Sequence, residues 1–126
     1  MKINTTENGR FGEDLAVKYL TEQSYQIIER NYHIFGGEID IIAQDGNELA
    51  FIEVKLRNQG TEDDAILSIT KSKQKRIVKT ALQYIATHEE AETLYSRFDI
   101  IIIMQDKHQH YHLNHYKNAF YSDADF

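Results

Sequence analysis

Cysteine and proline are both absent from the sequence, and each absence excludes something. Without cysteine the protein can have no disulfide, no thiolate zinc site and no cysteine nucleophile, which suits a reducing cytoplasm. Without proline, its turns must rely on Gly, Asn and Asp. No stretch approaches the roughly 20 apolar residues of a membrane-spanning helix. We therefore expect a cytoplasmic protein that does not enter a membrane.

Positive charge is scarce as well. The chain has 14 Lys and Arg residues against 20 Asp and Glu residues, which gives a net charge of -6. Affinity for phosphate comes largely from Lys and Arg, so this balance argues against a protein that coats nucleic acid nonspecifically. Any nucleic-acid site must therefore gather its cations in one place.

The spacing of apolar residues predicts one α/β domain, an α+β sandwich, over residues 1–126. Its elements follow the order α-β-β-β-α-β-β, with predicted ranges 10–23, 25–34, 37–44, 48–57, 68–87, 98–104 and 109–116. The run 98–104 is almost wholly apolar and follows a helix, so we expect it to enter a mixed central sheet parallel to an earlier strand. Residues 58–64 are polar and predict a surface loop.

The two strands around Asp45-Gly46-Asn47 predict a hairpin with one apolar face and one partly charged face. Because side chains alternate along a strand, one face carries only Ile39, Ile41 and Ala43 from the first strand and Ala50, Ile52, Val54 and Leu56 from the second. This face is predicted to lie in the core. The opposite face is apolar near the turn, and its far end carries Glu38, Asp40, Glu53, Lys55 and Arg57.

The position of the turn decides which acidic residues meet across this hairpin. A turn at Gly46-Asn47 places Asp40 directly opposite Glu53. A turn at Asp45-Gly46 places Glu38 opposite Glu53 and makes Asp40 a diagonal neighbour. A loop of odd length would separate the acidic residues onto different faces.

Carboxylates brought together in a sheet repel one another unless something compensates their charge. A divalent cation such as Mg²⁺ or Mn²⁺ is the natural compensation, since Mg²⁺ binds one or two carboxylates and keeps waters and phosphate oxygens as its other ligands. Asp40 and Glu53 would bind this ion, and Lys55 could orient a water molecule or neutralise the transition state. The competing interpretation is a solvated strand edge with a Glu53–Lys55 ion pair.

The second predicted helix carries the concentrated positive charge that a nucleic-acid site requires. It contains Lys71, Lys73, Lys75, Arg76 and Lys79, with no acidic residue between positions 65 and 88. Its core-facing residues are predicted to be Val78, Ala81, Leu82 and Ile85. At 100° per residue, Lys71, Gln74 and Lys75 fall near this apolar stripe, whereas Lys73 and Arg76 are expected to point elsewhere. A solvated helix face is the alternative.

The sequence resembles the bacterial YraN family, which is similar to restriction-endonuclease-like nucleases of the PD-(D/E)xK superfamily and to the core of Holliday-junction resolvases. The resemblance rests on Gly12-Glu13 with Ala16 and Tyr19-Leu20, Arg30-Asn31, the segments 37–43 and 51–57, Ser68 with Lys73-Gln74, Arg97-Phe98-Asp99 and Asn118-Ala119-Phe120. It implies a nuclease-type core in which Glu13, Asp40 and Glu53 are metal ligands and Lys55 is the catalytic lysine. The proline that leads the superfamily motif is replaced here by Ile39.

These observations support a Mg²⁺-dependent phosphodiesterase that acts on DNA, including branched or damaged DNA. The residues expected to bind substrate are Arg57, Lys71, Lys73, Gln74 and Lys75. By analogy with small nucleases of this type, a homodimer is also expected. The alternatives are a catalytically silent nucleic-acid-binding or assembly module with the same fold, and a scaffold recognised by another protein through its acidic surface.

Two further groups of residues favour structural roles. His108, His110 and His112 alternate, so a strand would place them on one face, but a fourth zinc ligand is not evident and polar alternation is the better interpretation. Asp99 follows Arg97 at the start of an apolar strand and is interpreted as a structural charge.

Overall fold

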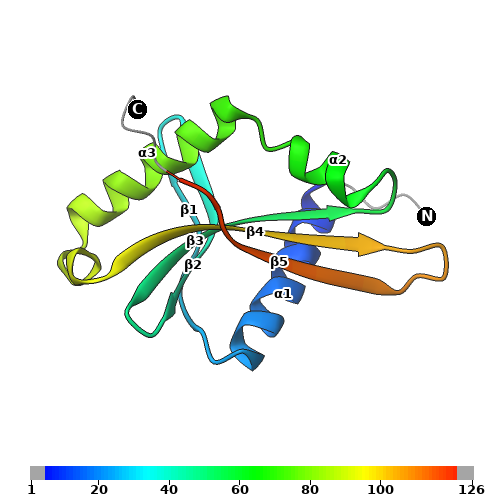
Figure 1. Cartoon of the computed structure of the whole chain (residues 1–126), viewed down its shortest axis with the longest axis horizontal. Helices are drawn as coiled ribbons and strands as arrows, with labels where there is room; N and C mark the ends of the chain where they lie inside the picture. Colours follow the sequence, from blue (N-terminus) through cyan, green and yellow to red (C-terminus); the bar gives the residue numbers. More distant parts are fainter. Residues whose placement is uncertain (1–4, 122–126) are drawn as a thin grey trace.

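The computed structural model describes residues 5–121, which form a central sheet with helices on both faces (Figure 1). The elements are α1 (Thr5–Glu22), β1 (Gln26–Ile34), β2 (Gly37–Asp45), β3 (Glu48–Arg57), α2 (Glu62–Leu67), α3 (Lys71–Thr87), a 3₁₀ helix η1 (Glu89–Thr93), β4 (Tyr95–Gln105) and β5 (Tyr111–Phe120). This arrangement confirms the predicted α+β sandwich and its order, with α2 and η1 as additional short elements. None of the helices within residues 5–121 is long and apolar enough to cross a membrane.

The sheet is mixed, as predicted. Its five strands lie in the order β1-β2-β3-β4-β5. β3 and β4 are parallel, and the other neighbouring pairs are antiparallel. The chain crosses from β3 to β4 through α2 and α3, because parallel neighbours need a long connection. The nearly continuous apolar run of β4 is therefore covered on both faces.

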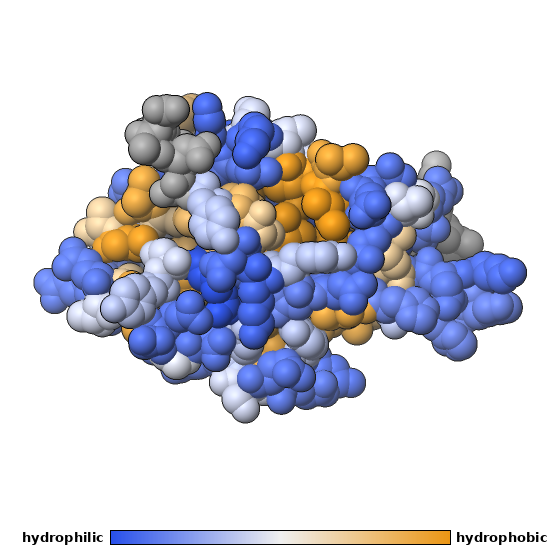
Figure 2. All heavy atoms as spheres, viewed as in Figure 1, coloured by the Kyte–Doolittle hydropathy of each residue, from blue (hydrophilic) through white to orange (hydrophobic). Residues whose placement is uncertain are grey.

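Each face of the sheet has its own apolar core. On one face, Ala16 and Leu20 of α1 pack with Ile41, Ile52 and other buried residues of the sheet. On the other face, α3 packs with a second cluster that includes Phe51 and Ile42 of the strands. Figure 2 shows apolar side chains gathered between the α2–α3 segment and the sheet, with hydrophilic side chains around them. The two helices thus sandwich the sheet, and α3 covers the face that carries Glu53.

One part of the predicted alternation is wrong. Ile41 and Ala43 lie in the core under α1, whereas Ile39 packs in the core under α3. β2 therefore rotates between Ile39 and Ile41, so that successive odd positions no longer share a face.

The segment after β3 also differs from the prediction. The expected loop 58–64 gives way at Glu62 to helix α2, where the Thr61 side chain accepts a hydrogen bond from the Asp64 N–H and the Asp64 side chain accepts one from the Thr61 N–H. This reciprocal capping stabilises a helix start in a polar stretch. The long helix then begins at Lys71, after the N-cap Thr70, and not at Ser68.

The orientation of α3 corrects the predicted apolar stripe. Its buried residues are Ile77, Val78, Thr80, Ala81 and Tyr84, whereas Leu82 is 52% exposed. The helix is therefore rotated from the expected orientation. This rotation changes which of its cations face the sheet.

Candidate active site

The β2–β3 hairpin has the register in which Asp40 and Glu53 occupy opposite positions. Its ladder runs from Asp45 opposite Glu48 to Ile41 opposite Ile52, so the turn consists of Gly46 and Asn47. Beyond Ile41 the backbones separate, and the Asp40 Oδ2 atom accepts a hydrogen bond of 2.8 Å from the Val54 N–H. The Asp40 side chain thus accepts the hydrogen bond that a backbone carbonyl of β2 would otherwise accept from Val54. This exchange fits the rotation of β2 at this point.

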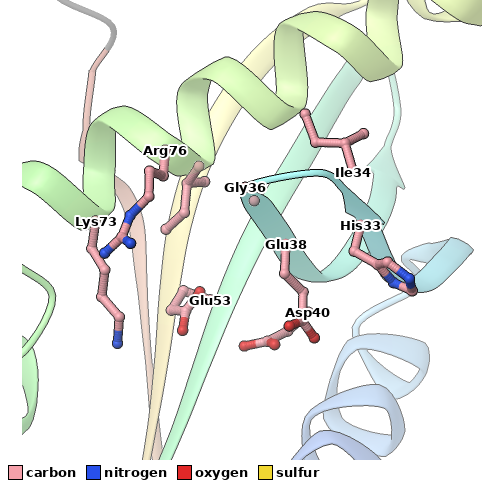
Figure 3. Close-up of a pocket in the computed structure, with 10 residues that line it drawn as sticks. His33, Ile34, Gly36, Glu38, Asp40, Glu53, Lys73 and Arg76 are labelled. Carbon is pink, nitrogen blue, oxygen red and sulfur yellow. The ribbon is translucent and has the colours of Figure 1, made fainter.

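A cavity of about 550 Å³ lies where β2 leaves β3. It is lined by His33, Ile34, Gly36, Gly37, Glu38, Asp40, Glu53, Lys73, Arg76 and Ile77. Figure 3 shows that Lys73 and Arg76 extend from α3, while Glu38, Asp40 and Glu53 come from the sheet. Acidic and basic side chains therefore meet around one cavity, from three separate segments of the chain.

The carboxyl groups of Asp40 and Glu53 are held in an environment that disfavours their charge. Burial, together with the charge of Glu53, raises the pKa of Asp40 to about 7, although the Val54 hydrogen bond opposes both effects. Burial also raises the pKa of Glu53, and the nearby charges of Lys55 and Lys73 oppose this rise. The protein therefore does not fully compensate the negative charges of these two neighbouring acidic groups. A bound cation would compensate them.

Cationic side chains lie beside Glu53. Lys55 Nζ is 3.6 Å from Glu53 Oε1, and both side chains are largely buried. The contact with Lys55 lowers the pKa of Lys73, burial lowers it further, and the charge of Glu53 raises it. The charge of Arg57 also lowers the pKa of Lys73, although the Arg57 side chain is exposed and bonds to the Leu56 carbonyl. Lys55 and Lys73 therefore flank the same carboxylate.

Glu13 is buried near the carboxylates, but other residues hold its side chain. Its Oε1 atom accepts hydrogen bonds from Asn31 Nδ2 at 3.1 Å and from Arg30 Nε at 3.4 Å. Burial raises the pKa of Glu13, and Arg30 opposes this effect. The charge of Glu13 also raises the pKa of Asp40. Glu13 is thus close enough to act on Asp40 electrostatically, although it does not line the cavity.

The donor set fits a hard divalent cation with few protein ligands. Among the side chains that the structure describes, those of residues 9–121, no three His, Asp or Glu are arranged to hold one metal ion. The expected trio of Glu13, Asp40 and Glu53 is therefore not assembled in this conformation. Two neighbouring carboxylates are nevertheless the ligand number that Mg²⁺ commonly takes from a protein, with waters and phosphate oxygens completing its shell.

The predicted substrate-binding residues divide into two groups. Lys73 lines the cavity. Lys71 and Lys75 are exposed on α3 and do not line it. Gln74 donates a hydrogen bond of 3.1 Å to the Ile69 carbonyl and lines a separate groove beside Tyr116. The structure therefore brings only Lys73 of these α3 residues to the carboxylates.

Arg76 is a cavity residue that sequence reasoning missed. It was expected to point away with Lys73, because the apolar stripe of α3 was assigned to the wrong face. Residues three apart lie on one face of a helix, so the spacing of Lys73 and Arg76 did signal that they belong together. His33 carried no such signal, since its place at the cavity depends on the bend of the β1–β2 hairpin.

Comparison with known proteins places the chain in a family. The model of the uncharacterised protein family UPF0102 matches residues 12–103. The chain belongs to this family. It is the YraN family that the sequence motifs indicate.

Relatives in UPF0102 are similar over nearly their whole length. A UPF0102 protein of Acinetobacter baumannii strain AYE is 40% identical, over 91% of this chain and 95% of its own. One from Geobacter metallireducens is 40% identical, over 95% of this chain and 97% of its own. One from Chlorobium limicola is 42% identical, over 92% of this chain and 93% of its own.

The UPF0102 segment contains all the acidic and basic residues of the cavity but not the histidine cluster. His108 and His110 precede β5 in the turn after β4, so the three histidines do not share a strand face as predicted. Asp106 accepts the N–H groups of His108 and His110, and its Oδ2 atom lies 2.9 Å from His112 Nε2. These contacts organise the turn.

Asp99 belongs to a buried network on the α1 face of the sheet. It is fully buried and accepts hydrogen bonds from Arg97, from the Asn118 N–H and from His115, whose Nε2 atom lies 2.7 Å away. Arg97 also donates to the Tyr25 hydroxyl at 2.7 Å. Every polar group of this network has a partner, as its structural interpretation requires.

Proposed function

We propose that this UPF0102 protein is a Mg²⁺- or Mn²⁺-dependent nuclease that hydrolyses phosphodiester bonds of DNA. The observation that carries the proposal is the cavity in which the partly buried Asp40 and Glu53 face Lys73 and Arg76, with Lys55 Nζ 3.6 Å from Glu53 Oε1. Although the protein has a net charge of -6, basic side chains gather here beside two neighbouring carboxylates that could bind a metal ion. Such a combination suits the transfer of a phosphoryl group.

Asp40 and Glu53 are the residues that would hold the metal, with Glu13 as a neighbouring negative charge. A bound Mg²⁺ would supply charge stabilisation at a phosphoryl oxygen and would lower the pKa of a coordinated water. The same positive charge would favour the ionised forms of Asp40 and Glu53, whose pKa values burial raises. The site is thus matched to a cation before any substrate binds.

The cationic side chains have distinct parts in this proposal. Lys55 is positioned to orient the attacking water or to donate a hydrogen bond to a phosphate oxygen, because Glu53 holds its ammonium group at the site. Lys73 and Arg76 line the opposite wall, where they would bind the phosphates on either side of the cleaved bond. The exposed Lys71, Lys75 and Arg57 would extend this contact along the backbone. We place the activity in the cytoplasm, and a homodimer would present one site to each strand.

A second candidate is a nucleic-acid-binding or assembly module with the same fold and no turnover. The specific observation in its favour is that Arg30 and Asn31 already bond to Glu13, so the third acidic ligand is engaged elsewhere. Such a module would use Lys73 and Arg76 to bind phosphate but would not need a metal.

The deciding experiment is calorimetric titration of Mg²⁺ and Mn²⁺ into the wild type, Asp40→Asn, Glu53→Gln and the control Glu22→Gln. Glu22 is an exposed acidic residue at the end of α1, so its variant removes one charge without touching the cavity. Cleavage of linear, branched and single-stranded DNA, and of RNA, is followed in the same samples. We expect metal binding and DNA cleavage to disappear together in Asp40→Asn and Glu53→Gln and to persist in Glu22→Gln.

The opposite outcomes are equally clear. If the wild type binds no divalent metal, even with DNA present, the nuclease proposal is wrong and the binding module becomes the better account. Preferential cleavage of RNA would keep the chemistry and change the substrate.

A further inference from the structure

The turn between β1 and β2 presents an aromatic side chain at the rim of the cavity. Ile34 pairs with Gly37, so Phe35 and Gly36 form the tip of this hairpin. Gly36 has a φ of 88°, which glycine adopts without strain. Phe35 has a relative exposure of 106%, the highest among the exposed large apolar residues within the described part of the chain. Its ring therefore contacts solvent on all sides.

A single exposed apolar residue is ordinary on a protein surface, so exposure alone says little. The position of Phe35 is what distinguishes it. Ile34, Gly36 and Gly37, its neighbours in the turn, all line the cavity that holds Asp40 and Glu53. Figure 3 shows Gly36 at this cavity, opposite the helix that carries Lys73 and Arg76. Phe35 therefore belongs to the turn that borders the candidate active site.

The hairpin tip is held in place by α3. A Cβ atom on Gly37 would clash with Thr80 Oγ1 and would lie 3.3 Å from the Arg76 carbonyl oxygen, so the strand touches the helix backbone here. Tyr32 and Tyr84 make an edge-to-face contact at 5.2 Å between ring centroids. Because these contacts join the hairpin to α3, the backbone of the turn at Phe35 has a defined position relative to the helix that carries Lys73 and Arg76.

An aromatic ring on an anchored turn, beside a wall of cationic side chains, is a combination by which proteins bind unpaired bases. Every base offers a π face for stacking, and the cations hold the backbone. Phe35 precedes Asp40 by five positions, and the turn and the start of β2 lie between them.

We infer that Phe35 stacks on an unpaired base next to the phosphate that a metal at Asp40 and Glu53 would bind. This inference rests on the proposed phosphate site and specifies its substrate class. The substrate is DNA with unpaired bases near the cut, such as a single strand, a flap or a branch, in preference to a continuous duplex. In a continuous duplex the bases are stacked on each other, so the ring has no exposed base face to bind.

The absence of tryptophan from the sequence permits a direct test. Phe35→Trp introduces a single tryptophan at the hairpin tip. The matched control is Tyr95→Trp, because Tyr95 is 70% exposed and lies beside Glu48, at the opposite end of the β2–β3 hairpin. Both are made in the Glu53→Gln background, which keeps the DNA intact. Fluorescence is followed during titration with single-stranded, flap and blunt duplex oligonucleotides.

We expect the tryptophan emission of Phe35→Trp to be quenched by single-stranded and flap DNA and to change little with blunt duplex, while the control tryptophan stays unchanged with all three. In otherwise wild-type protein, Phe35→Ala should weaken binding of single-stranded DNA by roughly 5- to 150-fold, the range for loss of one stacked base. Its effect on blunt duplex should be under about 2-fold, because no stacked base is lost there. Phe35→Leu should behave like Phe35→Ala, because it keeps the apolar character but lacks the ring.

Different outcomes separate this inference from the nuclease proposal. If DNA binds with high affinity but the emission of Phe35→Trp does not respond, or if Phe35→Leu binds like the wild type, the stacking role is wrong and the phosphate site stands. If metal-dependent cleavage is absent but the emission of Phe35→Trp is quenched only by unpaired DNA, the inference holds for a binding module. If no oligonucleotide binds at low salt, both are overturned.

Discussion

Asp40 combines three properties that are in conflict unless the residue has a function. It is partly buried, it lies beside another acidic residue, and its carboxylate accepts a hydrogen bond from the Val54 N–H. Its pKa of about 7 means that the protein without metal holds a proton there over a range in which the unfolded chain has released it. The residue therefore reduces stability near neutral pH, as functional residues often do.

We predict that Asp40→Asn stabilises the metal-free protein at pH 8. Asp40 has an ordinary pKa of 3.8 and a folded pKa of about 7, so the unfolding free energy of the wild type falls as pH rises between these values. The asparagine side chain keeps a hydrogen-bond acceptor for the Val54 N–H and does not ionise. The gain should be on the order of 3 kcal/mol at pH 8 and should vanish near pH 4. Urea denaturation with a chelator present measures it, and an equal pH dependence in wild type and variant would contradict it.

For Asp99, which forms a buried ion pair with Arg97, we predict the opposite dependence of stability on pH. Hydrogen bonds from His115 and Arg97 outweigh burial and lower the pKa of Asp99. Its contribution to stability is therefore present above its ordinary pKa and is lost as pH falls through the lower folded value. Asp99→Ala should cost about 3–5 kcal/mol, because it leaves the buried Arg97 guanidinium with only the more exposed carboxylates of Asp45 and Glu48 as ionic partners.

An exposed pair supplies the control for this variant. Asp14 bonds to Arg30 at 2.7 Å, and its side chain is 59% exposed. Asp14→Ala should change stability by less than about 1 kcal/mol, since solvent screens such pairs. Denaturation curves that show similar losses for both variants would mean that the Asp99 network contributes little.

At the level of elements, the site depends on how closely β2 approaches α3. Thr80 is fully buried, and its hydroxyl donates to the Arg76 carbonyl at 2.7 Å. Gly37 packs against this hydroxyl without room for a side chain. The strand that carries Asp40 and the helix that carries Lys73 and Arg76 thus meet closely at Gly37 and Thr80.

Gly37→Ala should therefore destabilise the fold by about 1–3 kcal/mol, the usual cost of overpacking. The double variant Gly37→Ala/Thr80→Ala should recover part of the loss, because Thr80→Ala removes the atom that clashes. Gly9→Ala, in α1 with open space at its Cβ position, should instead stabilise by about 0.5–1 kcal/mol. Thermal denaturation of these variants and of Thr80→Ala alone tests the contact, and independent, additive effects would argue against it.

At the level of the whole molecule, the net charge of -6 repels DNA, so binding must depend on the positive charges near the cavity. We expect affinity for an oligonucleotide to fall steeply with salt and the slope of log K against log salt to decrease by about one in Lys73→Gln and in Arg76→Gln. Lys107→Gln is the control, because Lys107 is exposed in the turn after β4, outside the cavity. A slope that changes equally in all three variants would mean that binding reflects overall charge.

The predictable part of the site was its local geometry. An even turn at Gly46-Asn47 and the strand period of two bring Asp40 opposite Glu53, and both signals act over short sequence distances. The rotation of β2 at Asp40 could not be predicted, because it follows from packing of Ile39 under α3. The missed helix α2 had a readable capping box at Thr61 and Asp64, hidden in a polar stretch that resembled a loop.

The sequence by itself determined the family, the order of the elements, the parallel entry of β4 and the candidate pair of carboxylates, because periodicity and short motifs specify these locally. Tertiary structure alone decided the partners of that pair. The rotation of α3 brought Arg76 to the cavity and sent Gln74 to another groove, and the Gly37–Thr80 contact set the hairpin tip beside them. The physical reason is that a helix with cations around much of its surface is oriented by the core it buries, and that core is assembled from strands far away in the chain.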